Sequence, residues 1–202
     1  DVYKRQVQEC GIGLVQIRRE GKRLAFAAPP RRKDGPLDHA DVDLITRGLG
    51  LNSGDIIDHA WCDNGPRWRG VLLRSAELVL ALKPDAAILA GLDIGVVGPR
   101  AKVGVVGQRA MVGTLTPVDA GVAFEVRAFF PGNNGMVEDP VTGSLNAGLA
   151  QWLIGAGHAP PNYVASQGTA VGRAGRVHIE SAEGEIWVGG ESVTCIDGHV
   201  RI

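Results

Sequence analysis

The sequence predicts an α+β fold in which a curled sheet of short strands wraps around one central helix. Two observations predict it. Short apolar runs alternate with turn signals along most of the chain, and 29 glycines in 202 residues suit tight turns that need positive φ. A Gly/Ala-rich helix is expected at about residues 142–155, where Gly143, Ala147, Gly148 and Ala150 would let strands approach it closely.

The first elements are expected to be a hairpin and a helix. Strands are predicted over residues 11–18 and 23–28, with Gly21 in the turn and Pro29-Pro30 ending the pairing. The preceding Glu9-Cys10-Gly11 is interpreted as the beginning of a strand. An amphipathic helix is predicted over 37–49, because Asp38 lies near its start and Gly50 follows its end.

The middle and end of the chain are predicted to consist mainly of short strands. Residues 56–62 and 69–74 flank the turn signal Asp63-Asn64-Gly65-Pro66, and Ser75 begins a helix over 75–82. A short helix is expected at 85–90. Hairpin turns are expected at Glu183-Gly184 and Asp197-Gly198. Further strands are predicted at 94–97, 103–106, 122–130, 163–166, 176–180, 185–188 and 192–196, with 200–202 closing the chain.

The segment from 129 to 157 has the pattern of a strand end, a turn-rich loop and a helix. Residues 131–135 are expected to interrupt the strand, and Gly155 and Gly157 to end the helix. Asp139, Thr142 and Ser144 lie where the first N–H groups of that helix have no internal partner, so they can cap the helix or help it hold an anion. On spacing alone, an ordinary helix capped by Asp139 or Thr142 is the simpler interpretation.

Composition and motifs argue against several classes of function. A net charge of −1 gives no case for nucleic acid or an anionic membrane, and no apolar run approaches the length of a bilayer span, so a cytoplasmic location is expected. The histidines are dispersed, which predicts no metal site. The residues 142–144 do not form the G-x-S-x-G turn of a serine hydrolase, and 104–107 lack dinucleotide-binding spacing. Three dispersed cysteines are expected to be reduced: Cys10, Cys62 and Cys195.

One contiguous segment carries a family resemblance. Glu138-Asp139-Pro140-Val141-Thr142-Gly143-Ser144 resembles the E-D-P-x-T-G-S signature of the phenazine-biosynthesis isomerases, the PhzF-like proteins. Supporting similarity covers nearly the whole chain from Val7 onward and includes Asn64-Gly65-Pro66, Gln167-Gly168, Gly172-Arg173 and Val188-Gly189-Gly190. The resemblance implies a diaminopimelate-epimerase-like fold of two pseudo-symmetric lobes, each a β-barrel around a central helix, with the site between them.

The resemblance also implies a division of the chain. Residues 31–189 are expected to form a complete second lobe. Residues 1–30 are expected to be the remnant of a mostly missing first lobe, which residues 190–202 would join. Because no methionine precedes Met111, the chain is expected to be an N-terminally truncated fragment. Residues 1–6 do not match the family and are expected to be non-native.

A function and a set of site residues follow from the resemblance. It implies a cofactor-independent isomerase or epimerase that moves a proton within a small carboxylated metabolite, such as a dihydro-hydroxyanthranilate. Asp139 and Ser144 match positions assigned to catalysis. Family members are often homodimers, so a homodimer is one expectation. The substrate-binding residues implied are Asn64, Gly65, Thr142, Gly143, Gln167 and Gly168, although Asn64 could equally be only a turn residue.

The sequence departs from the family in its acid/base groups. The family's glutamate in an S-E-T-like segment is missing from these 202 residues, and Ile12 stands where a C-G-H motif would place histidine. The chain is therefore expected to bind a carboxylate but to transfer protons weakly or not at all, since a positioned acid/base contributes about 10²–10⁴-fold. The alternative is a carboxylate-binding or structural relative without catalysis. A two-cysteine racemase is disfavoured, because Asp139 and Ser144 occupy the start of the central helix.

Overall fold

The structure is a computed structural model that describes residues 5–52, 54–100, 103–105, 110–112, 121–133 and 135–200. Its elements, in chain order, are β1 (Arg5–Cys10), β2 (Gly13–Glu20), β3 (Arg23–Ala27), α1 (His39–Gly48), β4 (Ile56–Trp61), β5 (Arg69–Leu73), α2 (Ala76–Ala81), β6 (Ile94–Pro99), β7 (Val103–Val105), β8 (Ala110–Val112), β9 (Val122–Gly132), β10 (Gly135–Asp139), α3 (Gly143–Gly155), β11 (Asn162–Gln167), a 3₁₀ turn η2 (Thr169–Val171), β12 (Gly175–Ala182) and β13 (Glu185–Glu191).

One mixed sheet runs through most of the described strands. Its order is β1-β2-β3-β13-β12-β11-β9-β6-β5-β4, and β10 pairs with β9 outside this path. The β5–β6 and β9–β11 pairs are parallel, whereas the other pairs in this sheet are antiparallel. Strands β7 and β8 form a separate two-stranded sheet. The α+β class predicted from the sequence is therefore observed.

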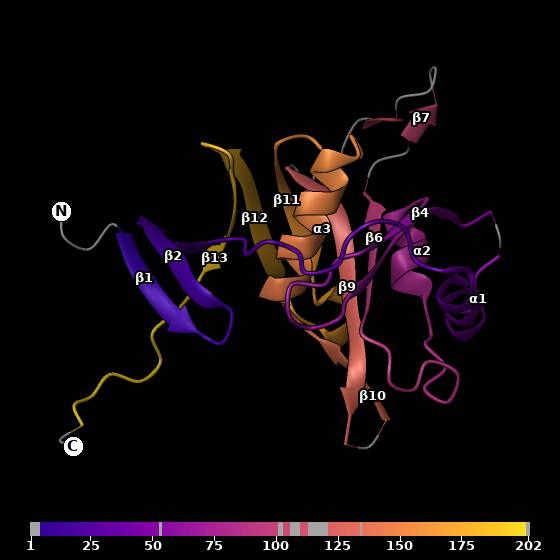
Figure 1. The fold of residues 1–202 in the computed structure, drawn as a ribbon, viewed down its shortest axis with the longest axis horizontal. Helices are drawn as coiled ribbons and strands as arrows, with labels where there is room; N and C mark the ends of the chain where they lie inside the picture. Colours follow the sequence, from indigo (N-terminus) through magenta and orange to yellow (C-terminus); the bar gives the residue numbers. More distant parts are fainter. Residues whose placement is uncertain are drawn as a thin grey trace.

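The sheet wraps around α3 without closing into the predicted barrel between the described strands. Strands β1 and β4 are its two ends and lie on opposite sides of α3 (Figure 1). The free edge of β4 is met by the segment that follows β3: the Trp61 N–H donates to the Gly35 carbonyl at 2.8 Å, and the Arg32 N–H donates to the Asp63 carbonyl at 2.6 Å. These bonds satisfy edge groups that another strand would otherwise have to pair.

The central helix lies at the heart of the larger core. Leu145, Leu149 and Leu153 are almost completely buried against strands from β5 to β13. A Cβ atom added at Gly148 would lie 2.7 Å from the Cys62 carbonyl oxygen, so only glycine permits this approach. The prediction that small residues bring strands close to the helix is confirmed at this position.

Helices α1 and α2 belong to a second core on the other face of the sheet. Ile45 of α1 and Val79 of α2 are fully buried there with Phe129 of β9. Both predicted caps are present: the Asp41 N–H donates to Asp38 Oδ1 at 2.9 Å, and the Leu78 N–H donates to Ser75 Oγ at 3.4 Å. Local sequence signals therefore located both helices.

Near the central helix, the predicted turn-rich loop is wrong. Pro131 and Gly132 remain in β9, and residues 135–139 return as β10, with Met136 opposite Pro131. Proline is tolerated here because the pairing of β9 with β6 ends at Phe129 and that with β11 at Val126, so Pro131 has a neighbouring strand on one side alone. The end of α3 follows the prediction, since Gly157 has φ of +77° and the His158 N–H donates to the Leu153 carbonyl at 2.8 Å.

Three other predicted elements differ. Glu9 and Cys10 end a strand instead of beginning one, because Gly11 lies in the tight turn to β2. The expected helix at 85–90 is only turns, in which Asp85 Oδ1 accepts from the Ala87 N–H at 2.9 Å. Residues 192–200 form no strand, so the expected strand at 192–196 and turn at Asp197-Gly198 are wrong; no neighbouring strand pairs with them.

Two predicted strands and the predicted division into lobes are covered only in part by the described residues. Residues 106 and 201–202, in two of the predicted strands, lie outside the described residues. Strand β3 pairs with β13, so residues on both sides of the boundary predicted at 30/31 share one sheet, and the two-lobe division stays a prediction. No helix of the described part is both long and apolar enough to cross a membrane.

The exposed edge at β1 predicts self-association. Val7 is 61% exposed on this edge strand, and an unpaired edge with apolar side chains favours pairing with another chain. We expect Val7→Lys to lower the associated fraction, measured by light scattering over a concentration series. Val193→Lys is the control, because Val193 is 85% exposed but lies outside any strand; an equal effect of both variants would contradict a role for the edge.

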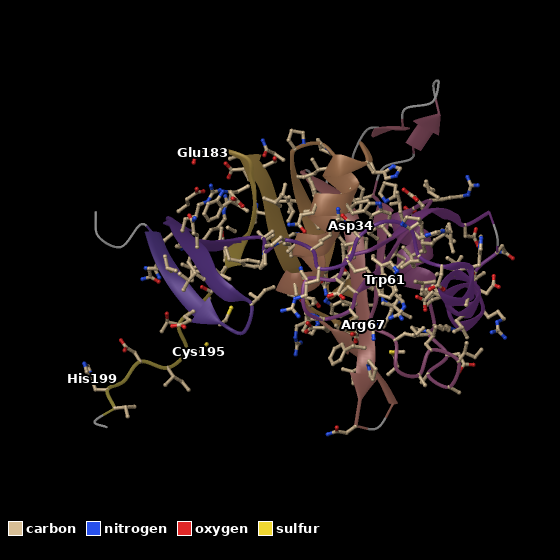
Figure 2. The ribbon with its side chains drawn as sticks, viewed as in Figure 1. Asp34, Trp61, Arg67, Glu183, Cys195 and His199 are labelled. Atoms are coloured by element: carbon tan, nitrogen blue, oxygen red, sulfur yellow. The ribbon has the colours of Figure 1, made fainter. Side chains whose placement is uncertain are left out.

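The three thiols are predicted to differ in reactivity. Burial raises the pKa of Cys62 from 9.0 to about 12, whereas Cys10 and Cys195 are exposed, the latter on the C-terminal segment (Figure 2). Because the thiolate is the reactive form, we expect two thiols to react with Ellman's reagent at pH 8 in the native protein and the third only after unfolding. Rapid reaction of all three without denaturant would contradict this burial.

Candidate functional site

The start of α3 is arranged differently from an ordinary capped helix. Thr142 occupies the N-cap position, but its side chain makes no capping hydrogen bond. Its hydroxyl instead donates to Asp139 Oδ2 at 2.7 Å. The first N–H groups of a helix have no internal acceptor, so those of Gly143 and Ser144 remain available to a ligand.

The Gln167 side chain holds this helix start in place. Its Oε1 accepts from the Thr142 N–H at 3.1 Å and from Asn146 Nδ2 at 2.8 Å. Its Nε2 donates to the Asp139 carbonyl at 2.9 Å and to Thr142 Oγ1 at 3.0 Å. Gln167 is completely buried, so the whole amide is engaged by the chain's own groups. We call Asp139, Thr142, Asn146 and Gln167 the helix-start network.

A cavity of about 640 Å³ opens beside the helix start. It lies between the β1–β2 hairpin, the segment after β3, the turn after β4 and the first residues of α3. Its apolar wall is formed mainly by Ile12, Val15, Ile17, Phe26, Pro29 and Pro66, and its polar groups come from Gln8, Cys10, Arg32, Asn64 and Ser144, with Gly11, Gly65 and Gly143. Apolar walls with a few polar groups are typical of small-molecule sites.

Asn64 and Ser144 meet in this cavity from distant parts of the chain. Asn64 Nδ2 donates to the Ser144 carbonyl at 2.8 Å, and Trp68 Nε1 donates to Ser144 Oγ at 3.0 Å. The Ser144 hydroxyl can therefore donate its own hydrogen elsewhere. Asn64 Oδ1 is buried and has no hydrogen-bond partner in the described structure. The site thus offers one hydroxyl donor, while the Asn64 acceptor is buried and unpaired.

The predicted site residues fall into two groups. Asn64, Gly65, Gly143 and Ser144 line the cavity together. The other four, Asp139, Thr142, Gln167 and Gly168, do not line it.

Three of these residues belong to the helix-start network, and Gly168 packs against the segment that leads into α3. Gly168 has φ of +92°, and a Cβ atom there would lie 2.7 Å from the Pro140 carbonyl oxygen. Gly168 therefore lets β11 end close to the segment that leads into α3. The functional roles predicted for these residues stay predictions.

Arg32 and Cys10 are cavity residues that sequence reasoning did not identify. Arg32 lies in the segment between β3 and α1, and Cys10 ends β1. Arg32 stands in no motif and Cys10 only in an incomplete one, so it is the fold that brings them opposite α3. The one feature of the sequence that could have indicated Cys10 is the likeness of Glu9-Cys10-Gly11 to a family motif, but this segment is interpreted above as the beginning of a strand.

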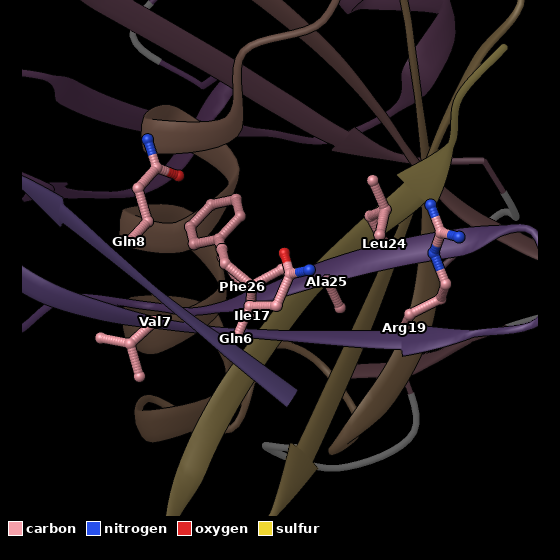
Figure 3. A pocket seen from close by; sticks show the side chains of 8 residues that line it. All are labelled: Gln6, Val7, Gln8, Ile17, Arg19, Leu24, Ala25 and Phe26. Atoms are coloured by element: carbon pink, nitrogen blue, oxygen red, sulfur yellow. The ribbon is translucent and has the colours of Figure 1, made fainter. Parts of the chain in front are cut away.

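A second cavity adjoins the first on the hairpin. Its volume is about 620 Å³, and Gln8, Ile17 and Phe26 line both cavities. Figure 3 shows its lining side chains, including Arg19 and Leu24, on strands β1, β2 and β3. The open inner face of the hairpin therefore continues from the helix start toward the sheet edge.

The first cavity can hold an anion. It combines free N–H groups at the positive end of a helix of 13 residues, the Ser144 hydroxyl and the Arg32 guanidinium. Among its described lining residues, none is Asp, Glu or His. The described part of the chain also contains no group of three His, Cys, Asp or Glu residues able to bind a metal ion.

Known proteins resemble this chain in sequence. A family model described as phenazine biosynthesis-like protein, PhzC-PhzF, matches residues 3–198. A curated protein of Pasteurella multocida (strain Pm70), named as an uncharacterized isomerase, is 31% identical over 210 residues, which cover 100% of this chain and 63% of that protein.

Solved structures resemble it in fold. A putative PhzC/PhzF protein from Clostridium difficile (strain 630) has a TM-score of 0.63 at 23% identity, covering 98% of this chain and 66% of its own. A PhzF family protein from Bacillus anthracis has a TM-score of 0.64 at 15% identity, with coverages of 93% and 65%. A predicted epimerase from Pseudomonas aeruginosa gives 0.61 at 17%, with 93% and 64%. The chain thus spans just under two thirds of each relative.

The helix-start network predicts a large stability effect. Gln167→Leu would leave the buried Thr142 N–H and Asn146 amide and the part-buried Asp139 carbonyl without their partner, so we expect the free energy of unfolding to fall by about 3 kcal/mol in urea denaturation. Gln151→Leu is the matched control, because Gln151 makes a single bond, to the Pro29 carbonyl at 3.0 Å. We expect that variant to lose about 1 kcal/mol or less. Similar losses in both would argue against a special role for Gln167.

Proposed function

Because the chain belongs to the phenazine biosynthesis-like (PhzC-PhzF) family, we propose that it acts as a cofactor-independent isomerase on a small carboxylated metabolite. The observation that carries this proposal is the helix start opening into the cavity. There the substrate carboxylate accepts from the Gly143 and Ser144 N–H groups and the Ser144 hydroxyl, while Arg32 balances its charge. The name of the Pasteurella multocida relative, an uncharacterized isomerase, supports the isomerase class.

The reaction proposed is the transfer of a proton between carbon atoms near the bound carboxylate. Holding the carboxylate against fixed donors stabilises the negative charge that develops when a neighbouring C–H is broken. Asp139 contributes indirectly, since its carboxylate accepts from the Thr142 hydroxyl and so helps fix the donors. Ser144 touches the substrate, whereas we assign Asp139 a positioning role.

The cavity lining contains few groups that could serve as the acid/base. Of the described residues that line the cavity, Cys10 and Arg32 alone are titratable. Arginine stays protonated, so the Cys10 thiol is the one lining group able to exchange a proton. We propose that this chain keeps the ability to bind the carboxylate and transfers protons only slowly. A carboxylate-binding relative without catalysis is the second candidate, and the missing carboxylate or imidazole in the lining favours it.

Binding can be tested with a stable carboxylate. We expect 3-hydroxyanthranilate to bind the protein and Arg32→Ala to weaken binding by about 10–100-fold, because hydrogen bonds to charged groups contribute about 1.5–3 kcal/mol. Ser144→Ala should weaken it less. Arg19→Ala is the control, since Arg19 lines the adjacent cavity instead. Isothermal titration calorimetry measures each affinity, and equal affinities across the set would refute the proposed binding mode.

Catalysis can be tested separately by solvent exchange. Incubation of a dihydro-hydroxyanthranilate in D₂O with the protein should place deuterium in the product if this chain transfers protons, and mass spectrometry would detect it. We expect slow incorporation that Cys10→Ala lowers further. Bound substrate with no label above the rate without protein would favour the non-catalytic candidate.

A further inference from the structure

Trp68 contacts the site residue Ser144 without reaching the cavity itself. Its indole Nε1 donates to Ser144 Oγ at 3.0 Å, although the two residues are 76 positions apart in the chain. The Trp68 side chain is only 4% exposed and packs in the core around α3. Ser144 lines the cavity, whereas Trp68 does not. An effect of the indole on a bound ligand would therefore pass through the serine hydroxyl.

The turn that carries Trp68 holds Ser144 at a second point. Asn64 Nδ2 donates to the Ser144 carbonyl at 2.8 Å. The turn is itself fixed by backbone bonds: the Cys62 N–H donates to the Trp68 carbonyl and the Trp68 N–H to the Pro66 carbonyl, both at 2.9 Å. The carbonyl and the hydroxyl of one serine are thus both held by the segment between β4 and β5.

The indole restricts the direction in which the serine hydroxyl can donate. An indole N–H is only a donor, so the hydrogen on Ser144 Oγ cannot be shared with Trp68 and needs an acceptor elsewhere. In the described part of the chain, the bond from Trp68 is the one hydrogen bond of Ser144 Oγ. Donation by the indole also polarises the hydroxyl, because hydrogen bonds in a chain strengthen one another. The hydroxyl is therefore kept as a donor for an acceptor in the cavity.

We propose that Trp68 is a positioning residue that makes Ser144 a directed donor to the carboxylate of the ligand. This inference rests on the proposed function, because it uses the same carboxylate site. It adds a specificity determinant: an ionised carboxylate, which only accepts hydrogen bonds, gains most from the polarised hydroxyl. A neutral carboxamide of the same shape gains less, because hydrogen bonds to charged groups are stronger.

The bond between Trp68 and Ser144 also has a purely structural interpretation. A buried indole N–H needs an acceptor, and the serine hydroxyl provides one. On that interpretation, loss of the indole would affect a charged and a neutral ligand alike, and would do so with or without the Ser144 hydroxyl. A comparison of two ligands in two backgrounds therefore distinguishes positioning from packing.

Isothermal titration calorimetry with 3-hydroxyanthranilate and its carboxamide tests the proposal. We expect Trp68→Phe to weaken binding of the acid by about 3–10-fold, the effect of one hydrogen bond, and to leave the affinity for the amide nearly unchanged. In the Ser144→Ala background, adding Trp68→Phe should cause no further loss, because the group through which the indole acts is gone. Replacement of Trp68 by benzothienylalanine, which lacks the N–H but keeps the ring shape, should reproduce Trp68→Phe and guards against loss of packing.

Trp152→Phe is the matched control for the lost volume. Trp152 lies in the same core and is 6% exposed, but it lines a different cavity, beside the last residues of α3. We expect this variant to bind the acid as tightly as the native protein does.

The outcomes separate this inference from the proposed function. Unchanged affinity for the acid in Trp68→Phe would overturn the inference alone. An equal loss for acid and amide, or an equal loss with and without the Ser144 hydroxyl, would also overturn it, since Trp68 would then act through packing. Binding of the acid that neither Arg32→Ala nor Ser144→Ala weakens would overturn the proposed carboxylate site, and this inference with it.

Discussion

The buried amide of Gln167 is the interaction on which the site depends. A helix start normally uses the side chain of its N-cap residue, but the Thr142 hydroxyl is bonded to Asp139. Gln167 accepts instead from the N–H of the N-cap residue Thr142 itself, and it reaches this position because β11 is buried beside α3. The Gly143 and Ser144 N–H groups therefore have no side-chain cap, and both residues line the cavity. A conventional cap would accept from the Ser144 or Leu145 N–H and remove it as a donor.

The segment between β3 and α1 has two roles in the structure. It covers the edge of β4 through the bonds to Gly35 and Asp63, which leaves the sheet open yet satisfies its edge groups. The same segment carries Arg32 to the cavity and Lys33 to the Trp61 ring. The segment that covers the sheet edge therefore also supplies Arg32, the one Lys or Arg among the described residues that line the cavity. Covering of the sheet edge and lining of the cavity therefore depend on the same segment.

Local signals allowed much of the fold to be predicted, and non-local packing explains what was missed. Asp38 and Ser75 cap their helices through bonds to residues three positions ahead, which spacing reveals. Strand β10 was missed because Pro131 has low strand propensity, yet pairing with Met136 overrides it. Half of the predicted site residues line the cavity. Arg32 and Cys10 could not be predicted, since their positions depend on contacts between distant segments.

The register of β10 explains how two adjacent acidic residues serve different structures. Asp139 lies opposite Ala128 and faces α3, whereas Glu138 lies opposite Phe129 and faces the second core. Glu138 therefore pairs with Arg127, with its Oε2 2.6 Å from Nη2, and Arg127 Nη1 donates to the Val79 and Leu82 carbonyls at the end of α2. Because neighbouring strand residues point to opposite faces, Glu138 cannot reach the cavity without a shift in register. Within the signature segment, one carboxylate anchors α2 and the other orders the start of α3.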